Sequence, residues 1–181
     1  ERVIIAIEGN KPEAIKRFNS KLHTRSSSTC NISIQTMPSA YPQGAEKQLI
    51  FNTTGRVVPA GGLPLEVGCV VQNVATLFAI CEAAYYGKPL IERMVTFAGS
   101  ALAEPKNVTL RLGTLVSELF EKEVLKLKTD PRKIIFGGPM MGTLVSSFDY
   151  PILKGTSGVL FLTEQDCDLR SESNCIRCGR C

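Results

Sequence analysis

The stretch RVIIAIEGNKPEAIKRFNSKL, Arg2–Leu22, decides the fold class of this chain. Its first part is a continuous apolar run that ends at Gly9, a pattern typical of a strand buried in a parallel sheet. Asn10 can cap a helix whose first turn accommodates Pro12, because the N–H that proline lacks would be unpaired there. The alternating segment CNISIQTM, residues 30–37, follows the helix as a second strand. Strand, helix and strand in this order predict a parallel βαβ unit.

The next part of the chain contains the start of a predicted helix and, after that helix, a long loop. YPQGAEKQLI, residues 41–50, leads into a helix, and TTGRVVPAGGLPLEVG, residues 53–68, is rich in Gly and Pro without a clear period. A loop of this length in a compact domain is usually functional. CVVQ, residues 69–72, predicts a short buried strand, and Asn73 is placed to cap a helix that Gly87 ends.

The composition changes near Lys88, where β-type segments begin to dominate. Four such segments are RMVTFAG, NVTLRLG, KIIFGG and VLFL, and an amphipathic helix is predicted from Leu115 to about Lys126. This arrangement favours a small β-grasp-like α+β unit. FGGPMMG, residues 136–142, lacks the GxxxxGK[ST] pattern of a phosphate loop and predicts a tight turn with two core methionines.

Composition and charge exclude two classes of protein. The net charge is +4, and Lys and Arg are scattered among Asp and Glu rather than clustered, which argues against a nucleic-acid partner. The longest apolar stretch, around residues 67–86, contains Gln72, Asn73 and Glu82, so no transmembrane span is predicted. Cys69 and Cys81 lie in apolar surroundings and are predicted to be buried free thiols.

The last nine residues, SNCIRCGRC, place Cys175, Cys178 and Cys181 at CxxCxxC spacing. Thiolates suit zinc or iron–sulfur clusters, but a structural zinc site normally pairs two separated CxxC units. The overlapping spacing instead opens the ferredoxin run CxxCxxCxxxCP, so we predict three ligands of one [4Fe-4S] cluster. The fourth ligand is expected in sequence beyond these residues, and an intact cluster is therefore not expected in this chain. Chance clustering and zinc binding remain the alternatives.

Six segments, in order and spacing, resemble the C subunit of the Rnf electron-transport complex: YPQGAEKQLI, GLPLEVGCVVQNVATL, GKPLIERMVTFAG, FGGPMMG, KGTSGVLFL and CIRCGRC. The resemblance covers essentially the whole chain, and that family is similar to the flavoprotein subunit of respiratory complex I. It implies a partial Rossmann-like α/β domain for FMN and NADH over residues 1–87. A soluble-ligand-binding β-grasp domain would follow over residues 88–163, and a linker with the first half of a [4Fe-4S] motif over residues 164–181. The chain is then expected to be a middle fragment that binds FMN and NAD weakly or not at all.

The resemblance also implies cofactor-binding residues at the positions that match the family. These are Glu8, Tyr41, Gly44, Glu46, Asn73 and Thr76. Three neighbours depart from the pattern of the complex I relative, since Gly9 and Ala45 stand where acids are common and Gln72 replaces an asparagine. The helix start at Asn73 could offer N–H groups to a phosphate, although Asn73 could equally be only an N-cap. Glu46 could be a solvated helix-start acid, and Glu8 could cap the Asn10 helix region.

The function that the resemblance implies is electron transfer between NAD(H), FMN and [4Fe-4S] clusters. The intact protein would be an oxidoreductase subunit of a membrane-associated ferredoxin:NAD complex, with ferredoxin and other subunits as partners. It would lie peripherally on the cytoplasmic side of the membrane, and the partner subunits would couple the reaction to ion transport. Two alternatives stay open: a soluble relative associated with cobalamin or proline reductase, and a non-catalytic β-grasp module with a zinc-binding tail.

Overall fold

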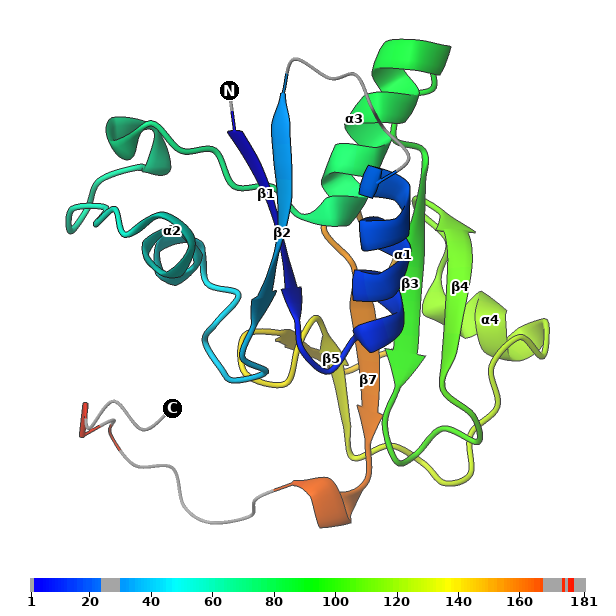
Figure 1. Ribbon diagram of the computed structural model, residues 1–181. Coiled ribbons are helices and arrows are strands. Elements are labelled where there is room, and N and C mark those ends of the chain that lie inside the picture. The colour runs from blue at the N-terminus through cyan, green and yellow to red at the C-terminus, as the bar shows by residue number, and fades with distance from the viewer. Residues whose placement is uncertain (1, 24–29, 168–173, 175, 178–181) are drawn as a thin grey trace. The chain divides into compact units, whose positions relative to one another are not determined.

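The computed structural model describes residues 2–23, 30–167, 174 and 176–177, and it confirms a mixed α/β fold (Figure 1). The chain forms two compact units, one built from residues up to Val74 and one running from Ala75 to Asn174. Unit 1 contains β1 (Arg2–Glu8), α1 (Pro12–His23), β2 (Asn31–Met37), α2 (Glu46–Thr54) and the 3₁₀ turn η1 (Pro64–Val67). Unit 2 contains α3 (Val74–Tyr86), β3 (Glu92–Ala98), β4 (Lys106–Arg111), α4 (Val116–Glu121), β5 (Lys133–Phe136), β6 (Thr143–Val145), β7 (Gly158–Leu162) and the 3₁₀ turn η2 (Glu164–Asp166).

Unit 1 is organised around one parallel strand pair, as the sequence predicted. β1 and β2 run side by side from Arg2 opposite Asn31 to Glu8 opposite Met37. The helix α1 connects them and packs against β2 (Figure 1). The next helix, α2, ends at Gly55, whose φ of 73° is the left-handed conformation that glycine adopts without steric cost.

Unit 2 is a five-stranded mixed sheet whose strands do not follow chain order. The spatial order is β4-β3-β7-β5-β6. β7, the last strand in sequence, lies at the centre, parallel to β3 and antiparallel to β5. The other neighbouring strands pair antiparallel. The four strands that the sequence predicted in this region are confirmed, and β6 is an edge strand that the sequence reasoning missed.

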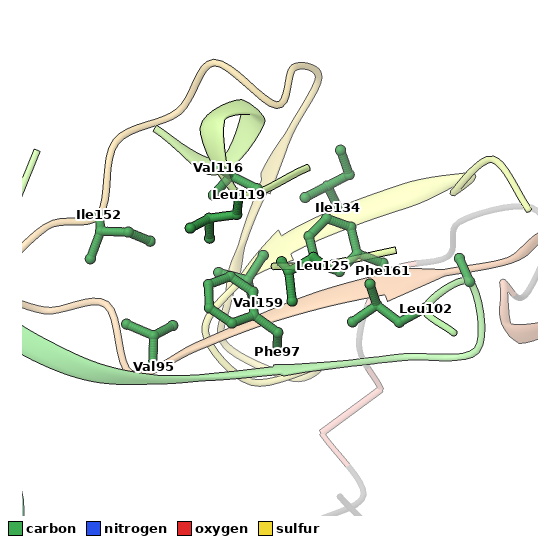
Figure 2. Packing of buried hydrophobic residues seen from close by; sticks show 11 residues of the cluster. Val95, Phe97, Leu102, Val116, Leu119, Leu125, Ile134, Ile152, Val159 and Phe161 are labelled. Atoms are coloured by element: carbon green, nitrogen blue, oxygen red, sulfur yellow. The ribbon is translucent and has the colours of Figure 1, made fainter. Parts of the chain in front are cut away.

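The core of unit 2 lies between this sheet and α4 (Figure 2). Eleven residues form one buried cluster, and the residues that close it are Val116 and Leu119 of α4. Phe161 of β7 contributes the most aromatic contacts, with its ring centroid 6.5 Å from that of Phe97 and 5.6 Å from that of Phe120. Burial of this kind stabilises a fold by about 25 cal/mol per Å² of apolar surface.

Four sequence predictions about local structure are wrong. The segment 69–72 is not a strand, and Val70 within it is 72% exposed. The helix predicted to reach Lys126 ends at Glu121, because Glu123 adopts a φ of 54°, which does not fit a right-handed helix. The turn at FGGPMMG is confirmed, but Met140 and Met141 at its tip are exposed rather than core residues.

The fourth correction concerns the free cysteines. Cys81 is exposed and Cys69 is only partly buried, whereas Cys167 is the buried one among the described cysteines. Among the described residues, no helix is both long and apolar enough to cross a bilayer.

Candidate functional site

The carboxyl ends of β1 and β2 form one edge of unit 1, and two hydrogen bonds donated by backbone N–H groups connect the segments that follow them. Gly9 N–H donates to the Met37 carbonyl at 2.9 Å, and Asn10 N–H donates to the Ser39 hydroxyl at 3.2 Å. Ligands of α/β folds bind at such an edge, outside the carboxyl ends of parallel strands. These contacts connect the loop after Glu8 to the segment 37–39, which precedes Tyr41 in the sequence.

Glu8, the last residue of β1, holds its carboxylate at the surface. Its Oε2 lies 2.8 Å from Lys11 Nζ, and the same ammonium donates to Asn10 Oδ1 at 3.1 Å. Both side chains of the ion pair are about half exposed. An exposed pair of this kind contributes little to stability.

The turn at residues 41–46 carries three of the predicted residues. Its backbone is closed by Gln43 N–H donating to the Ala40 carbonyl and Ala45 N–H donating to the Pro42 carbonyl, both at 2.8 Å. Tyr41 is 54% exposed, and a Cβ added at Gly44 would meet no atom within 4 Å. Both residues are therefore accessible at the surface of unit 1.

Glu46 begins α2, and its position is electrostatically favourable. Ala45 occupies the N-cap position without a side-chain cap, so the first N–H groups of the helix are not capped by a side chain. An acid in the first turn interacts favourably with the positive end of the helix dipole. The simpler alternative for Glu46, a helix-start acid, thus fits its position as well as a ligand contact does.

Asn73 and Thr76 lie at the start of α3. Asn73 immediately precedes the helix, and Thr76 is in its first turn. Asn73 belongs to unit 1, whereas Thr76 belongs to unit 2. Both positions agree with the predicted helix start, and their part in cofactor binding stays a prediction.

The long loop after α2 is ordered by side chains that sequence reasoning did not single out. The Arg56 guanidinium donates to the carbonyls of Val67 at 2.7 Å and Gly68 at 3.4 Å, and its Nη1 lies 3.8 Å from Cys69 Sγ. Lys47 Nζ donates to the Pro59 carbonyl at 2.9 Å. The glycine-rich loop around Arg56 has no periodic pattern of apolar residues. The sequence therefore does not indicate that Arg56 makes these contacts.

One further residue in the 41–46 turn was also missed. Within the described parts of the chain, two buried side-chain nitrogens have no hydrogen-bond partner, Gln43 Nε2 and Arg93 Nε. Buried polar groups are nearly always paired, so each such atom requires an explanation. Gln43 lies between the predicted ligand residues Tyr41 and Gly44, which makes this turn a reasonable fit for a cofactor that carries acceptor oxygens.

The predicted cluster ligands Cys175, Cys178 and Cys181 lie outside the described residues. In the described part of the chain, no three or more His, Cys, Asp and Glu side chains gather into a possible metal site. Soft thiolates in CxxCxxC spacing fit an iron–sulfur cluster by the chemistry of the donor set.

Before the cysteine segment in the sequence, Ser100, Thr163 and Asp166 form a cluster of hydrogen bonds, called the polar clasp below. The Asp166 carboxylate accepts hydrogen bonds from the Ser100 hydroxyl and from the Thr163 hydroxyl and N–H, the last two at 2.9 and 3.0 Å. The Ser100 and Thr163 donors hold the pKa of Asp166 below its ordinary value, because they stabilise the ionised carboxylate. The hydrogen bonds of the clasp connect η2 to the turn that follows β3.

A second charged group joins α3 to β3 within unit 2. Lys88 Nζ lies 2.6 Å from Glu92 Oε1 and 3.0 Å from Glu82 Oε1. Hydrogen bonds to Glu92 and then Glu82 raise the pKa of Lys88, and Lys88 lowers the pKa of Glu92. These groups lie in no predicted site, and we assign them a structural role.

Comparison with known proteins first defines a class. Residues 1–82 match the family model described as the Nuo51 FMN-binding domain. This match covers β1, α1, β2, α2 and most of α3, and so includes all six predicted cofactor-binding positions. The first part of the chain is therefore similar to a class of FMN-binding domains.

The particular relatives are C subunits of ion-translocating complexes. Over all 181 residues the chain is 47% identical to the C subunit of the proton-translocating ferredoxin:NAD⁺ oxidoreductase complex of Clostridium ljungdahlii. It is 39% identical to the C subunit of the Na⁺-translocating counterpart from Acetobacterium woodii, and 39% identical to that of the ion-translocating oxidoreductase complex of Rhodobacter capsulatus. All of this chain is covered in each case, and it spans 38%, 40% and 34% of the respective relatives. The resemblance to the Rnf C-subunit family is confirmed.

Proposed function

We propose that this chain is part of an electron-transfer subunit that moves electrons between NAD(H), FMN and [4Fe-4S] clusters. The observation that supports it most strongly is similarity along the whole chain to three such C subunits. The intact protein would be an NAD-linked oxidoreductase subunit of a ferredoxin:NAD complex. Its partners would be the other subunits, ferredoxin and NAD(H), and it would lie peripherally on the cytoplasmic side of the membrane.

The proposed domain plan assigns a role to each part of the chain. Residues 1–87 would form part of a Rossmann-like FMN and NADH domain, and residues 88–163 a β-grasp domain. Residues 164–181 would form the linker and the first half of a ferredoxin-type motif. The parallel β1–β2 pair supports the first assignment, and a mixed sheet with α4 against one face supports the second.

When bound, FMN would supply the exchange between two-electron hydride chemistry and one-electron transfer. The residues of this chain would position it. The exposed Tyr41 ring offers a face for stacking, and Gly44 leaves space for close approach. Glu8 and Glu46 would contribute negative charge to the site, and Asn73 with Thr76 would present the start of α3 to an anionic group. Cys175, Cys178 and Cys181 would hold iron through thiolates.

The experiment that tests this function is anaerobic reconstitution of a longer version of the protein that contains these 181 residues. We expect a brown protein with a broad visible absorption band and, after reduction by NADH in the presence of FMN, a paramagnetic [4Fe-4S] signal. Substituting Cys178 with Ser should remove one cluster's signal and leave FMN binding unchanged. A colourless protein that retains zinc would contradict the electron-transfer function and favour the binding-module alternative.

A further inference from the structure

A surface cavity of about 590 Å³ opens beside α4 in unit 2. All of its lining residues fall between positions 117 and 148, so the cavity belongs to unit 2 alone. Its volume lies within the range of about 300–1,000 Å³ that small-molecule sites occupy. None of the predicted flavin or cluster residues lines it. A function of this cavity would therefore be additional to electron transfer.

Backbone hydrogen bonds hold the walls of the cavity in place. After the end of α4, the N–H groups of Val124 and Leu125 both donate to the Leu119 carbonyl, at 2.8 and 3.0 Å, so the chain lies back against the helix. On the other side of the helix start, Ser117 N–H donates to the Phe148 carbonyl at 2.9 Å. The cavity is therefore formed by the fold itself, without a ligand to shape it.

Two aromatic rings and two leucines form the apolar part of the lining. The rings belong to Phe120 and Phe148, whose centroids lie 5.1 Å apart in an edge-to-face arrangement. The leucines are Leu125, which is 2% exposed and part of the core, and Leu127. Rings and branched side chains of this kind offer a contact surface to a flat apolar molecule.

The polar part of the lining includes two side chains that the protein leaves without a partner. Ser117 and Glu121 are four residues apart on α4, so they are neighbours on the same face of the helix. Within the part of the chain that the structure describes, neither side chain forms a hydrogen bond or an ion pair. Lys122, the nearest lysine in sequence, is ion-paired with Glu118 at 2.7 Å instead. The hydroxyl and the carboxylate are both able to accept a hydrogen bond from a ligand.

The charges of the lining select the chemistry of that ligand. Glu123 and Lys126 also line the cavity and pair with each other at 3.4 Å, so their charges offset one another. Glu121 then leaves one negative charge in the lining. A protonated amine is attracted by this carboxylate and by the faces of aromatic rings, whereas a carboxylate or phosphate group is repelled by it.

We propose that the cavity beside α4 binds a small organic amine. The flat apolar body of the ligand would lie against Phe120 and Phe148, and its protonated nitrogen would donate hydrogen bonds to the Glu121 carboxylate and the Ser117 hydroxyl. This site involves unit 2 alone and does not depend on the proposed flavin or cluster sites.

The test compares three probes that share an indole body and differ in the charge of the end group. The ¹⁵N-labelled 181-residue chain is titrated with tryptamine, which is cationic, tryptophol, which is neutral, and indole-3-propionate, which is anionic. We expect tryptamine to move the backbone amide signals of Ser117, Leu127 and Phe148. Tryptophol should bind about fivefold more weakly, the effect of one partly exposed ion pair, and indole-3-propionate more weakly still.

Variants supply the second arm. Glu121→Gln keeps the size of the side chain and removes its charge, so it should weaken tryptamine about fivefold and leave tryptophol unchanged. Glu164→Gln is the matched control, because Glu164 is an exposed carboxylate of unit 2 that does not line the cavity. It should bind all three probes like the wild type. Circular dichroism establishes that each variant is folded.

Three results would overturn the proposal. Tryptamine that moves none of the cavity signals at millimolar concentration would exclude the site. Equal binding of tryptamine and indole-3-propionate, or unchanged tryptamine binding by Glu121→Gln, would exclude the amine. An acetylated Trp-Lys dipeptide amide that binds more than about tenfold tighter than tryptamine would show that the cavity serves a protein segment rather than a small molecule. Because no flavin is involved, the proposed function is unaffected by each of these results.

Discussion

Units 1 and 2 of this chain contrast in how they bury apolar surface. Unit 2 closes an eleven-residue cluster between a five-stranded sheet and α4. Unit 1 has a two-stranded sheet, and its described buried apolar residues are Ile7, Met37, Ile50 and Val58. The predicted flavin residues lie mostly on unit 1. The comparison teaches that the larger buried core and the candidate flavin site lie mostly in different parts of the molecule.

The largest expected effect is a steric one inside unit 2. Gly99 has a φ of 119°, and a Cβ there would overlap the Phe161 carbonyl. We expect Gly99→Ala to destabilise unit 2 by more than about 4 kcal/mol, because backbone rather than a side chain blocks it. Urea unfolding followed by NMR measures the loss. The control is Gly113→Ala, which has a φ of 88° but no neighbouring atom within 4 Å and should cost about 1–2 kcal/mol. Equal effects would contradict the steric argument.

Removing the central aromatic side chain should have the next largest effect. Phe161 is fully buried and packs against Phe97, Phe120 and Phe148. Phe161→Ala should lower the free energy of unfolding of unit 2 by about 3–5 kcal/mol through lost burial and a cavity. Phe78→Ala, at a position 64% exposed on α3, serves as the control and should change the same measurement far less.

A core substitution in unit 1 sharpens the contrast between the units. Ile50 of α2 is 2% exposed, whereas the neighbouring Phe51 is 50% exposed. Ile50→Ala should destabilise unit 1 by about 2–3 kcal/mol, at the lower end for such changes because a thin core collapses easily around a cavity. Hydrogen exchange should show faster opening of β1 and β2 with unit 2 unchanged. Phe51→Ala should leave both units as they are. Faster exchange throughout unit 2 would show that the units do not unfold independently.

The smallest expected effect depends on pH. The folded pKa of Asp166 is depressed below its ordinary value of 3.8 by the Ser100 and Thr163 donors. A depressed pKa gives stability that is fully present above the unfolded pKa and is lost as pH falls through the folded pKa. The wild type should therefore lose stability in unit 2 below about pH 4, the ordinary pKa range of Asp, more steeply than Asp166→Asn does. Thermal melts at pH 7, 4 and 3 measure this, and identical acid slopes would exclude the clasp as a source of stability.

The spacing of apolar residues predicted most of the helices and strands, because the residues of each element that face the core are apolar. The apolar run of β1, the cap and Pro12 of α1 and the β-type segments of unit 2 all have local signals that tertiary packing reinforces. The helix α4 shows the limit of this reasoning. Leu125 still lies in the core, 2% exposed, although the helix ended at Glu121. The apolar pattern continued past the helix, and only the φ of Glu123 revealed the change of structure.

The errors occurred where short apolar segments had no partner to bury them. The segment 69–72 resembles a strand in composition but pairs with no strand among the described residues. Met140 and Met141 look like core residues but lie at a hairpin tip. In the candidate site, the helix starts and the shared strand edge could be predicted. Gln43 and Arg56 could not, because their importance depends on which atoms surround them in the folded loop.

The order of strands in unit 2 has a consequence for protein synthesis. β7 bridges β3 and β5, yet among the described strands it is the last to leave the ribosome. Before residues 158–162 emerge, the nascent chain can form the β3–β4 and β5–β6 hairpins, but each leaves an unpaired edge towards the missing centre. Exposed edges promote pairing with other chains, so translation that stalls before β7 should yield an aggregation-prone product.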